Sequence, residues 1–170
     1  MNRDKIFTFK NLAIQDLNDI LNLQNECIDN LTDAKIYYPL SRKEFKESLI
    51  RDIVIGSYIN DKLVAVAVII VNRNSLRNLA AETGGLSDST FTFDAVMVSP
   101  RWRGYGLQNI LIRQCIEMAE KNNISQIVAT VSPDNYHSLS NFIGLGFAIV
   151  LTTKKYNGLV RHIVRYSVAK

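Results

Sequence analysis

The chain changes its hydrophobic period several times, and each change marks a predicted helix or strand. Leu17, Ile20 and Leu21 begin a run of apolar residues spaced three and four apart, which predicts an amphipathic helix. Ser41 and Glu44 have the spacing of a capping box, in which the two side chains accept hydrogen bonds from free amides at a helix start. By these criteria we predict four helices, over Ile14–Leu31, Ser41–Asp52, Gly104–Asn122 and Ser138–Leu145.

Shorter apolar or alternating stretches predict strands before, between and after these helices. Asn60-Asp61-Lys62 and Asn157-Gly158 are favourable tight-turn sequences, so each is expected to join an antiparallel hairpin. The predicted strands are Lys5–Asn11, Ile53–Ile59, Leu63–Val71, Thr90–Val98, Ile127–Val131, Phe147–Lys154 and Leu159–Val168. The strand–helix–strand order after Thr90 predicts a right-handed parallel crossover. The expected class is mixed α/β or α+β, with helices on both faces of a mixed sheet.

Composition and charge narrow the class of protein, but they do not identify a binding partner. A chain of 170 residues, 47% hydrophobic and 21% charged, is expected to form one compact domain over residues 1–170. The net charge of +4 comes from scattered basic residues, which argues against a nucleic-acid footprint. Cys27 and Cys115 form neither a disulfide framework nor a zinc motif, so no metal is expected. The longest apolar run, Leu63–Val71, is too short to cross a bilayer, and a cytoplasmic location is expected.

The segment Val98–Leu107 is the most informative stretch, because it joins a predicted strand to a predicted helix. Gly104 and Gly106 permit backbone torsions and a close approach that a Cβ would forbid. Free amides at a helix start converge on an anion, and Arg101 and Arg103 add countercharge, so a diphosphate fits this segment. The glycine pair alone could equally serve only to shape the turn. A Rossmann fingerprint or a P-loop would need residues that this chain lacks.

Arg101, Gly104 and Gly106 match the Arg/Gln-x-x-Gly-x-Gly/Ala signature for coenzyme A, and the segment resembles the GCN5-related N-acetyltransferase (GNAT) superfamily. The longer family pattern is matched upstream by Asp94, Val96, Val98 and Pro100, and downstream by Asn135, Ser138, Phe142, Gly146 and Phe147. The resemblance implies a mostly antiparallel, seven-stranded mixed sheet that is splayed between its fourth and fifth strands and flanked by about four helices.

The same resemblance implies a set of residues that bind acetyl-CoA, the expected acyl donor. The backbone of Val96, Met97 and Val98 should pair with the pantetheine arm like an added strand. The amides from Arg101 to Leu107 should hold the pyrophosphate, with Arg103, Gly104, Tyr105 and Gly106 between them. Asn135 should bond to the pantetheine or to the splayed backbone. Ser138 and Phe142 should line the same side of the site.

Acetyl transfer to an amine also needs groups that move protons. Asp94 is the candidate base or amine anchor, because strand alternation places it on the face of Val96 and Val98, although a purely structural strand carboxylate is the alternative. Glu26 and Glu82 are weaker candidates, expected to face solvent. The family's usual acid is a tyrosine where this chain has Phe142. Tyr136, Tyr105 or water could replace it, or the thiolate could leave unprotonated.

We therefore expect an N-acetyltransferase that acts on a primary amine of a small molecule, peptide or protein in a ternary complex. The alternative is an acyl-CoA-binding sensor that has lost turnover together with the tyrosine. The acceptor groove should form from Ile14–Asp52, Asn72–Asp88 and the final hairpin. Exposed strands of that hairpin could pair with a second copy, which leaves a homodimer open.

Overall fold

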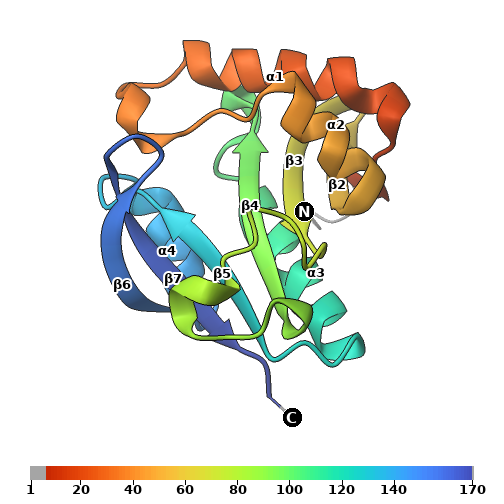
Figure 1. Cartoon of the computed structure of the whole chain (residues 1–170). Helices are drawn as coiled ribbons and strands as arrows, with labels where there is room; N and C mark the ends of the chain where they lie inside the picture. Colours follow the sequence, from red (N-terminus) through yellow and green to blue (C-terminus); the bar gives the residue numbers. More distant parts are fainter. Residues whose placement is uncertain (1–6, 170) are drawn as a thin grey trace.

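The computed structural model describes residues 7–169 and contains one seven-stranded sheet between two pairs of helices (Figure 1). The spatial order is β1-β2-β3-β4-β5-β7-β6, and every neighbouring pair is antiparallel except β4 and β5. The strands are β1 (Thr8–Asn11), β2 (Ile53–Ile59), β3 (Lys62–Ile70), β4 (Thr90–Val98), β5 (Gln126–Val131), β6 (Ala148–Lys155) and β7 (Leu159–Ser167). The predicted class is confirmed, while Lys5 and Ile6 of the first predicted strand lie outside the described residues.

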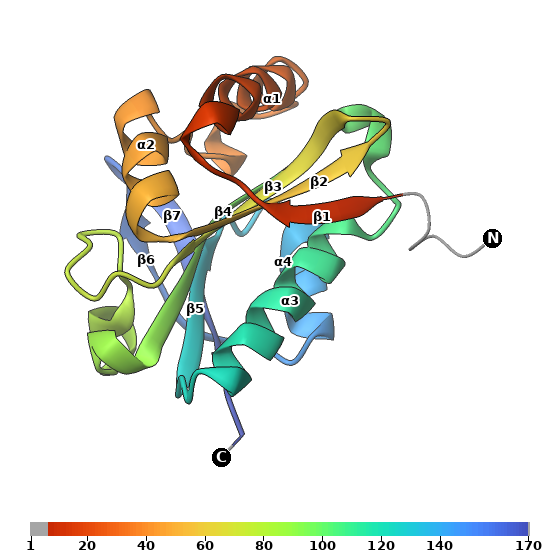
Figure 2. The ribbon, with the colours of Figure 1, turned by 90° about the vertical axis from the view of Figure 1, so that its right-hand side faces the viewer.

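Each face of the sheet is covered by one pair of helices (Figure 2). The helices are α1 (Leu17–Asp29), α2 (Arg42–Arg51), α3 (Leu107–Lys121) and α4 (Tyr136–Gly144). Ile20 of α1 and Phe45 of α2 pack with Val66 and Met97 on one face. The other core places Leu111 of α3 and Phe142 of α4 against the opposite face. Burial of these two apolar faces fixes which side of every strand points to which helix pair.

Local chemistry explains most helix boundaries. The predicted capping box of α2 is present, since the Ser41 side chain accepts from the Glu44 amide and the Glu44 carboxylate accepts from the Ser41 amide. The third helix begins at Leu107 rather than at the predicted Gly104, because Gly104 and Gly106 have φ angles of +80° and +78°. The fourth begins two residues before the predicted Ser138, after the Asn135 cap.

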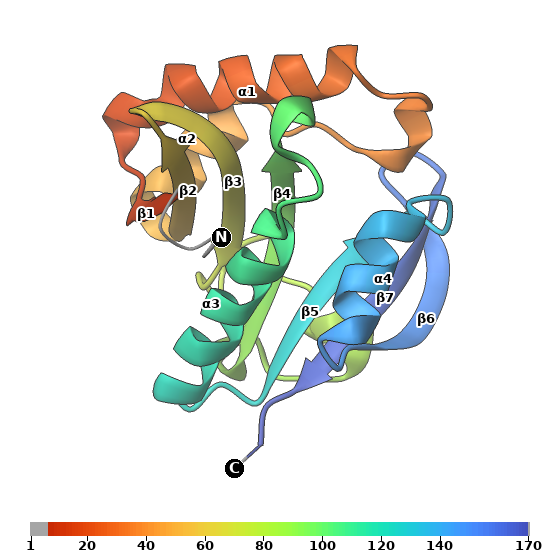
Figure 3. The same ribbon diagram turned by 180° about the vertical axis from the view of Figure 1, so that it is seen from behind.

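The two central strands separate halfway along their length. β4 pairs with β5 only from Thr90 to Phe93, opposite Gln126 to Ala129. Beyond that point β4 pairs with β3 alone, and Thr130 and Val131 of β5 pair with β7 alone. Figure 3 shows the two strands diverging towards the end where α1 lies. The predicted splay between the fourth and fifth strands is therefore confirmed.

A β-bulge in β4 lies just after the point of separation. Phe93 is opposite Ile69 and Ala95 is opposite Val68, so Asp94 is an extra residue without a partner in β3. Phe93 packs in the core beneath α3 and α4, whereas Ala95 packs in the core beneath α1 and α2. The bulge therefore interrupts the alternation of faces at Asp94.

Candidate active site

A pocket of about 280 Å³ lies where β4 and β5 separate. The residues around the bulge, Phe93–Val96, form one wall, and Thr130 and Val131 of β5 form the opposite wall together with Ser132, which follows the strand. Helix α4 contributes Ser138 and Phe142, and its N-cap residue Asn135 also lines the pocket. The remaining lining residues come from the segment between α1 and α2, from α2, from the β3–β4 connection and from the C-terminal hairpin: Ile36, Tyr37, Tyr38, Leu40, Glu44, Arg77, Tyr156 and Arg161. The predicted acceptor regions therefore meet at this pocket.

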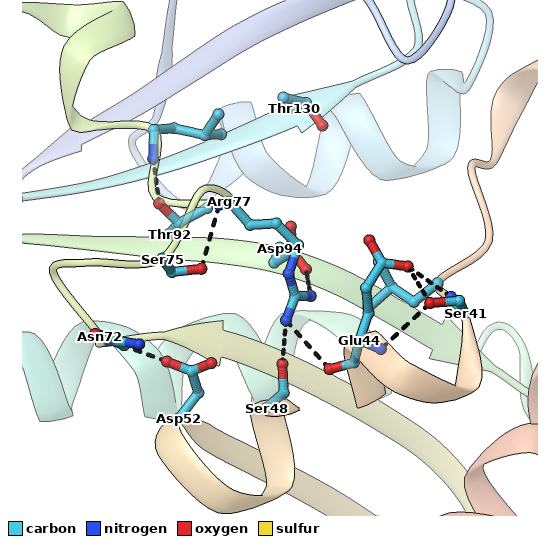
Figure 4. Close-up of polar contacts among 12 residues, drawn as sticks. Ser41, Glu44, Ser48, Asp52, Asn72, Ser75, Arg77, Thr92, Asp94 and Thr130 are labelled. Atoms are coloured by element: carbon cyan, nitrogen blue, oxygen red, sulfur yellow. Dashed lines mark hydrogen bonds and ion pairs between the residues drawn. The ribbon is translucent and has the colours of Figure 1, made fainter. Parts of the chain in front are cut away.

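Asp94 lies in the pocket wall as one half of a buried ion pair (Figure 4). Its Oδ2 accepts a hydrogen bond of 2.5 Å from Arg77 Nη1, and only 7% of its side chain is exposed. Arg77 comes from the β3–β4 connection, and its Nη2 also donates to Ser48 Oγ and to the Glu44 carbonyl. These contacts place Asp94 on the side of α2, while Val96 and Val98 pack with the α3 core. The prediction that Asp94 shares a face with Val96 and Val98 is therefore wrong, because the bulge adds one residue.

Burial in this wall changes the acidity of Asp94. Loss of hydration raises the pKa of Asp94 to about 6, and the Arg77 guanidinium opposes part of that rise. Nearby Glu44 raises it further, since two carboxylates repel in the ionised state. Among residues 7–169, none donates a hydrogen bond to the second oxygen of Asp94, Oδ1. The side chain thus combines a free acceptor oxygen with a pKa close to neutrality, which suits a general base.

Three tyrosines line the pocket, and none of them is Tyr136 or Tyr105. The Tyr156 hydroxyl is 3.0 Å from Thr130 Oγ1, and burial raises the pKa of Tyr156, which keeps it protonated at neutral pH. Tyr38 stacks on its ring at a centroid distance of 4.6 Å. The Tyr37 hydroxyl donates to Gln24 Oε1. A protonated phenol in the wall can give a proton to a leaving group.

The tyrosines named from the sequence lie elsewhere. Tyr136 is 73% exposed, and Tyr105 packs edge-on against Phe7 and beside Trp102. Neither lines the pocket. Phe142, at the family's tyrosine position, is buried between Phe93 and Phe147 and has no hydroxyl.

The loop before α3 has the form of an anion cradle. A Cβ at Gly104 or Gly106 would meet no atom within 4 Å, so the space beside both glycines is open. Within residues 7–169, no group accepts a hydrogen bond from the amides of residues 103–109. Arg101 and Arg103 are exposed beside them, while Leu107 is buried and anchors the first turn of α3. These features fit the pyrophosphate of coenzyme A.

The second half of β4 offers unpaired backbone groups to the split. The Ser99 amide bonds to the Val64 carbonyl of β3 at 2.8 Å, which fixes the hydrogen-bonding phase of β4. Because this phase alternates along an antiparallel pair, Met97 also bonds towards β3, and Val96 and Val98 point their backbone groups away from it. Val98 uses its carbonyl to accept from Cys27 Sγ. Val96 is one of the residues that line the pocket.

The remaining predicted residues occupy defined positions. Asn135 caps α4 by accepting from the Ser138 amide, and Ser138 Oγ accepts from Gln108 Nε2. Glu26 accepts from Ser99 Oγ and Glu82 pairs with Lys155, so both are half-buried rather than fully solvent-facing, and neither lines the pocket.

Residues 7–169 contain no group of three or more His, Cys, Asp or Glu side chains placed to hold a metal ion. In the same range, no helix has the length and apolar character needed to cross a membrane.

Comparison with known proteins identifies the family. The model of the acetyltransferase (GNAT) family matches residues 15–147. The chain belongs to this family of acyl-CoA-dependent acetyltransferases, whose cofactor is acetyl-CoA. No curated protein sequence matches the chain.

Solved structures with the same fold include three bacterial acetyltransferases. The ribosomal-protein-S18-alanine N-acetyltransferase of Escherichia coli has a TM-score of 0.75 at 19% identity, over 96% of this chain and 95% of its own. An N-acetyltransferase from Staphylococcus aureus Mu50 has a TM-score of 0.72 at 18% identity, over 96% and 99%. A phosphinothricin acetyltransferase of Sinorhizobium meliloti, solved with acetyl-CoA, has a TM-score of 0.73 at 16% identity, over 96% and 89%. At these identities the likeness shows the fold alone.

Proposed function

We propose that this protein is an N-acetyltransferase that transfers the acetyl group of acetyl-CoA directly to a primary amine in a ternary complex. The observation that carries the proposal is the pocket at the split, which is lined both by Val96, whose backbone groups point away from β3, and by Asp94. A hydrogen-bond donor for a developing oxyanion and a base for an ammonium are the two groups that this reaction needs side by side.

In this proposal the acyl donor lies along the split. The backbone of Val96, Met97 and Val98 supports the pantetheine arm, and α4 with its cap closes the other side through Asn135, Ser138 and Phe142. The cradle holds the pyrophosphate through amides between Arg101 and Leu107, namely those of Arg103, Gly104, Tyr105, Gly106 and Leu107, and the two arginines supply charge.

The chemistry then follows from three groups. Asp94 Oδ1 takes a proton from the acceptor ammonium, and the neutral nitrogen attacks the thioester carbon while the Val96 amide stabilises the charge on oxygen. A C–N bond forms and the C–S bond breaks. Tyr156 gives its proton to the departing thiolate, in the role that the family assigns to a tyrosine on the helix corresponding to α4. The nitrogen, which became positively charged on attack, loses its second proton, and this proton restores the Tyr156 hydroxyl. Close alignment of the two substrates supplies much of the remaining rate.

The role of Tyr156 predicts a selective loss of turnover. Tyr156→Phe keeps the ring that stacks on Tyr38 but removes the hydroxyl, so kcat should fall about 10²-fold with little change in KM for acetyl-CoA. Steady-state kinetics measure this, and Tyr136→Phe, which alters an exposed hydroxyl outside the pocket, is the matched control. Equal kcat in the two variants would remove Tyr156 from the mechanism.

The direct test of the function is release of free thiol from acetyl-CoA. The panel of acceptors should include polyamines, amino acids, aminoglycosides and peptides with free N-termini, and calorimetry should follow coenzyme A binding in parallel. Turnover with any amine, together with an N-acetylated product by mass spectrometry, supports the proposal. Absence of coenzyme A binding would contradict it.

A second candidate function rests on Phe142. Because this side chain cannot protonate a thiolate, the protein could bind acyl-CoA as a sensor without turnover. Saturable binding of coenzyme A with no thiol release from any acceptor would favour the sensor over the enzyme.

We also propose that the chain acts as a single domain over residues 1–170, in the cytoplasm, and that it forms a homodimer. Strand β6 is an edge strand, and its consecutive residues Ile149, Val150 and Leu151 are 44%, 38% and 41% exposed. Val150 is a bulge residue without a partner in β7, so the exposed apolar side chains, rather than the strand backbone, favour contact with a second copy. Val150→Lys is expected to shift the sedimentation coefficient from that of a dimer to that of a monomer. A monomeric wild-type protein at assay concentration would contradict the homodimer.

A further inference from the structure

The pocket contains one buried cation without an acidic partner. Arg161 of β7 is 4% exposed and lines the pocket. Its Nη1 donates to the Val160 carbonyl at 2.9 Å and its Nη2 to the Lys35 carbonyl at 2.8 Å. Among residues 7–169, no carboxylate lies within 4.0 Å of its guanidinium nitrogens. Buried arginines normally face a carboxylate or another anion, so this arrangement is unusual.

The other charges of the pocket are already compensated. Arg77 is neutralised by Asp94. Glu44 accepts hydrogen bonds from the Ser41 amide and hydroxyl; burial alone would raise the pKa of Glu44, but these bonds and Arg77 hold it below its ordinary value. Besides its two carbonyl contacts, the Arg161 guanidinium lies over the face of the Tyr156 ring, with its Cζ 5.8 Å from the ring centroid. An aromatic face compensates a buried guanidinium only in part.

We propose that Arg161 binds a carboxylate of the acceptor, so that the acceptor is a small amino acid whose amine reaches Asp94. This inference rests on the proposed N-acetyltransferase function. A guanidinium offers five N–H donors in a planar fork, and the two carbonyls that Arg161 contacts leave donors for a ligand. The pocket of about 280 Å³ admits a molecule of this size.

The position of Arg161 implies that the carboxylate and the amine of such an acceptor bind at different ends of the pocket. It lies on β7, with β5 between it and β4, and Asp94 lies in the opposite wall. Figure 1 shows the β6–β7 turn next to the segment between α1 and α2, where Arg161 contacts the Lys35 carbonyl. The carboxylate would therefore bind beneath this segment, and the amine would point to the thioester.

The first experiment compares matched acceptors in the thiol-release assay. α-, β- and γ-amino acids are each paired with the corresponding amide, and 2-aminoethyl phosphate is added as a non-carboxylate anion. We expect kcat/KM to be at least about 10²-fold higher for the best amino acid than for its amide, a ratio typical of a lost charged contact. Equal rates for acid and amide, or a preference for the phosphate, would overturn the assignment.

Variants then test whether Arg161 is the residue that selects amino acids over their amides. In Arg161→Gln the acid-to-amide ratio should fall to about one, whereas Arg165→Gln on the same strand, outside the pocket, should keep the wild-type ratio. If Arg161 serves only to bind the Lys35 carbonyl, Arg161→Gln should lower the melting temperature and leave the acid-to-amide ratio unchanged. If Arg161→Gln does not fold, Arg161→Lys keeps the charge without the fork and should reduce the ratio. A wild-type ratio in folded Arg161→Gln would contradict the proposal.

A binding measurement separates this inference from the proposed function. Calorimetry with N-acetyl amino acids and their amides, in the presence of coenzyme A, requires no turnover. If the N-acetyl amino acids bind and their amides do not, and if this binding is lost in Arg161→Gln, the anion site is supported even if no acceptor is acetylated. Conversely, acetylation of amines without any preference for a carboxylate would leave the enzyme in place and refute the anion site.

Discussion

Gly104→Glu is expected to abolish acetyl-CoA binding, with at least about a 100-fold loss of affinity, which corresponds to about 2.8 kcal/mol. Gly104 has a φ of +80°, a region that costs an L-residue roughly 1–2 kcal/mol. The new carboxylate would also occupy the open space beside the free amides of residues 103–109, where it would repel a pyrophosphate. Isothermal titration calorimetry with acetyl-CoA measures the loss.

The chain offers a close control for this substitution. Gly84 also has a positive φ, +67°, and a Cβ there would likewise meet no atom within 4 Å. It lies in the β3–β4 connection, before the start of β4, whereas the cradle follows the end of that strand. Gly84→Glu therefore carries comparable backbone strain and the same added charge, and it should bind acetyl-CoA like the wild type. Equal affinities for Gly104→Glu and Gly84→Glu would show that the loop is not the pyrophosphate site.

Asp94→Asn should lower kcat/KM by about 10²–10⁴-fold, the range that a general base contributes. The wild-type profile should rise with pH through about 6, because burial raises the pKa of Asp94 to about 6 and the base acts only when ionised. This limb is distinct from the one caused by the acceptor amine, which titrates at higher pH. In Asp94→Asn the limb near pH 6 should disappear.

The same pKa shift predicts the direction of a stability change. The folded pKa lies above the ordinary value of 3.8, so the folded state holds this proton more tightly than the unfolded state. The stability contributed by Asp94 is therefore complete below about pH 4 and is lost as pH rises to about 6.

Glu82→Gln is the matched control for the activity of Asp94→Asn. Glu82 is also a carboxylate in an ion pair, with Lys155, but it lies outside the pocket. A greater loss of activity in Glu82→Gln than in Asp94→Asn would exclude Asp94 as the base.

Periodicity predicted the elements well because each element has one buried face. The apolar spacing that begins at Leu17 and the capping box of Ser41 and Glu44 are local signals, and both correspond to helices in the fold. The bulge at Asp94 left no such signal. The residues on either side of it are apolar, so the inversion of faces between Phe93 and Ala95 cannot be read from the sequence.

The acceptor side of the pocket was the least predictable part. Tyr156 and Arg161 come from the C-terminal hairpin, whereas Tyr38 and Lys35 come from the segment after α1, more than a hundred residues earlier. Only the tertiary fold brings these residues together. The cradle was predictable because its glycines, arginines and amides are all consecutive in the sequence.

The divergence of β4 from β5 gives the sheet an edge in its interior. At the rim of a sheet, unpaired amides such as that of Val96 would attract strands of other chains and promote aggregation. Here the same groups lie in a wedge between two strands that rejoin at Phe93 and Ala129, with helices over both faces. These groups are therefore not presented at the rim of the sheet, where a strand of another protein could add to them. The fold thus keeps unpaired backbone groups away from the edges at which aggregation begins.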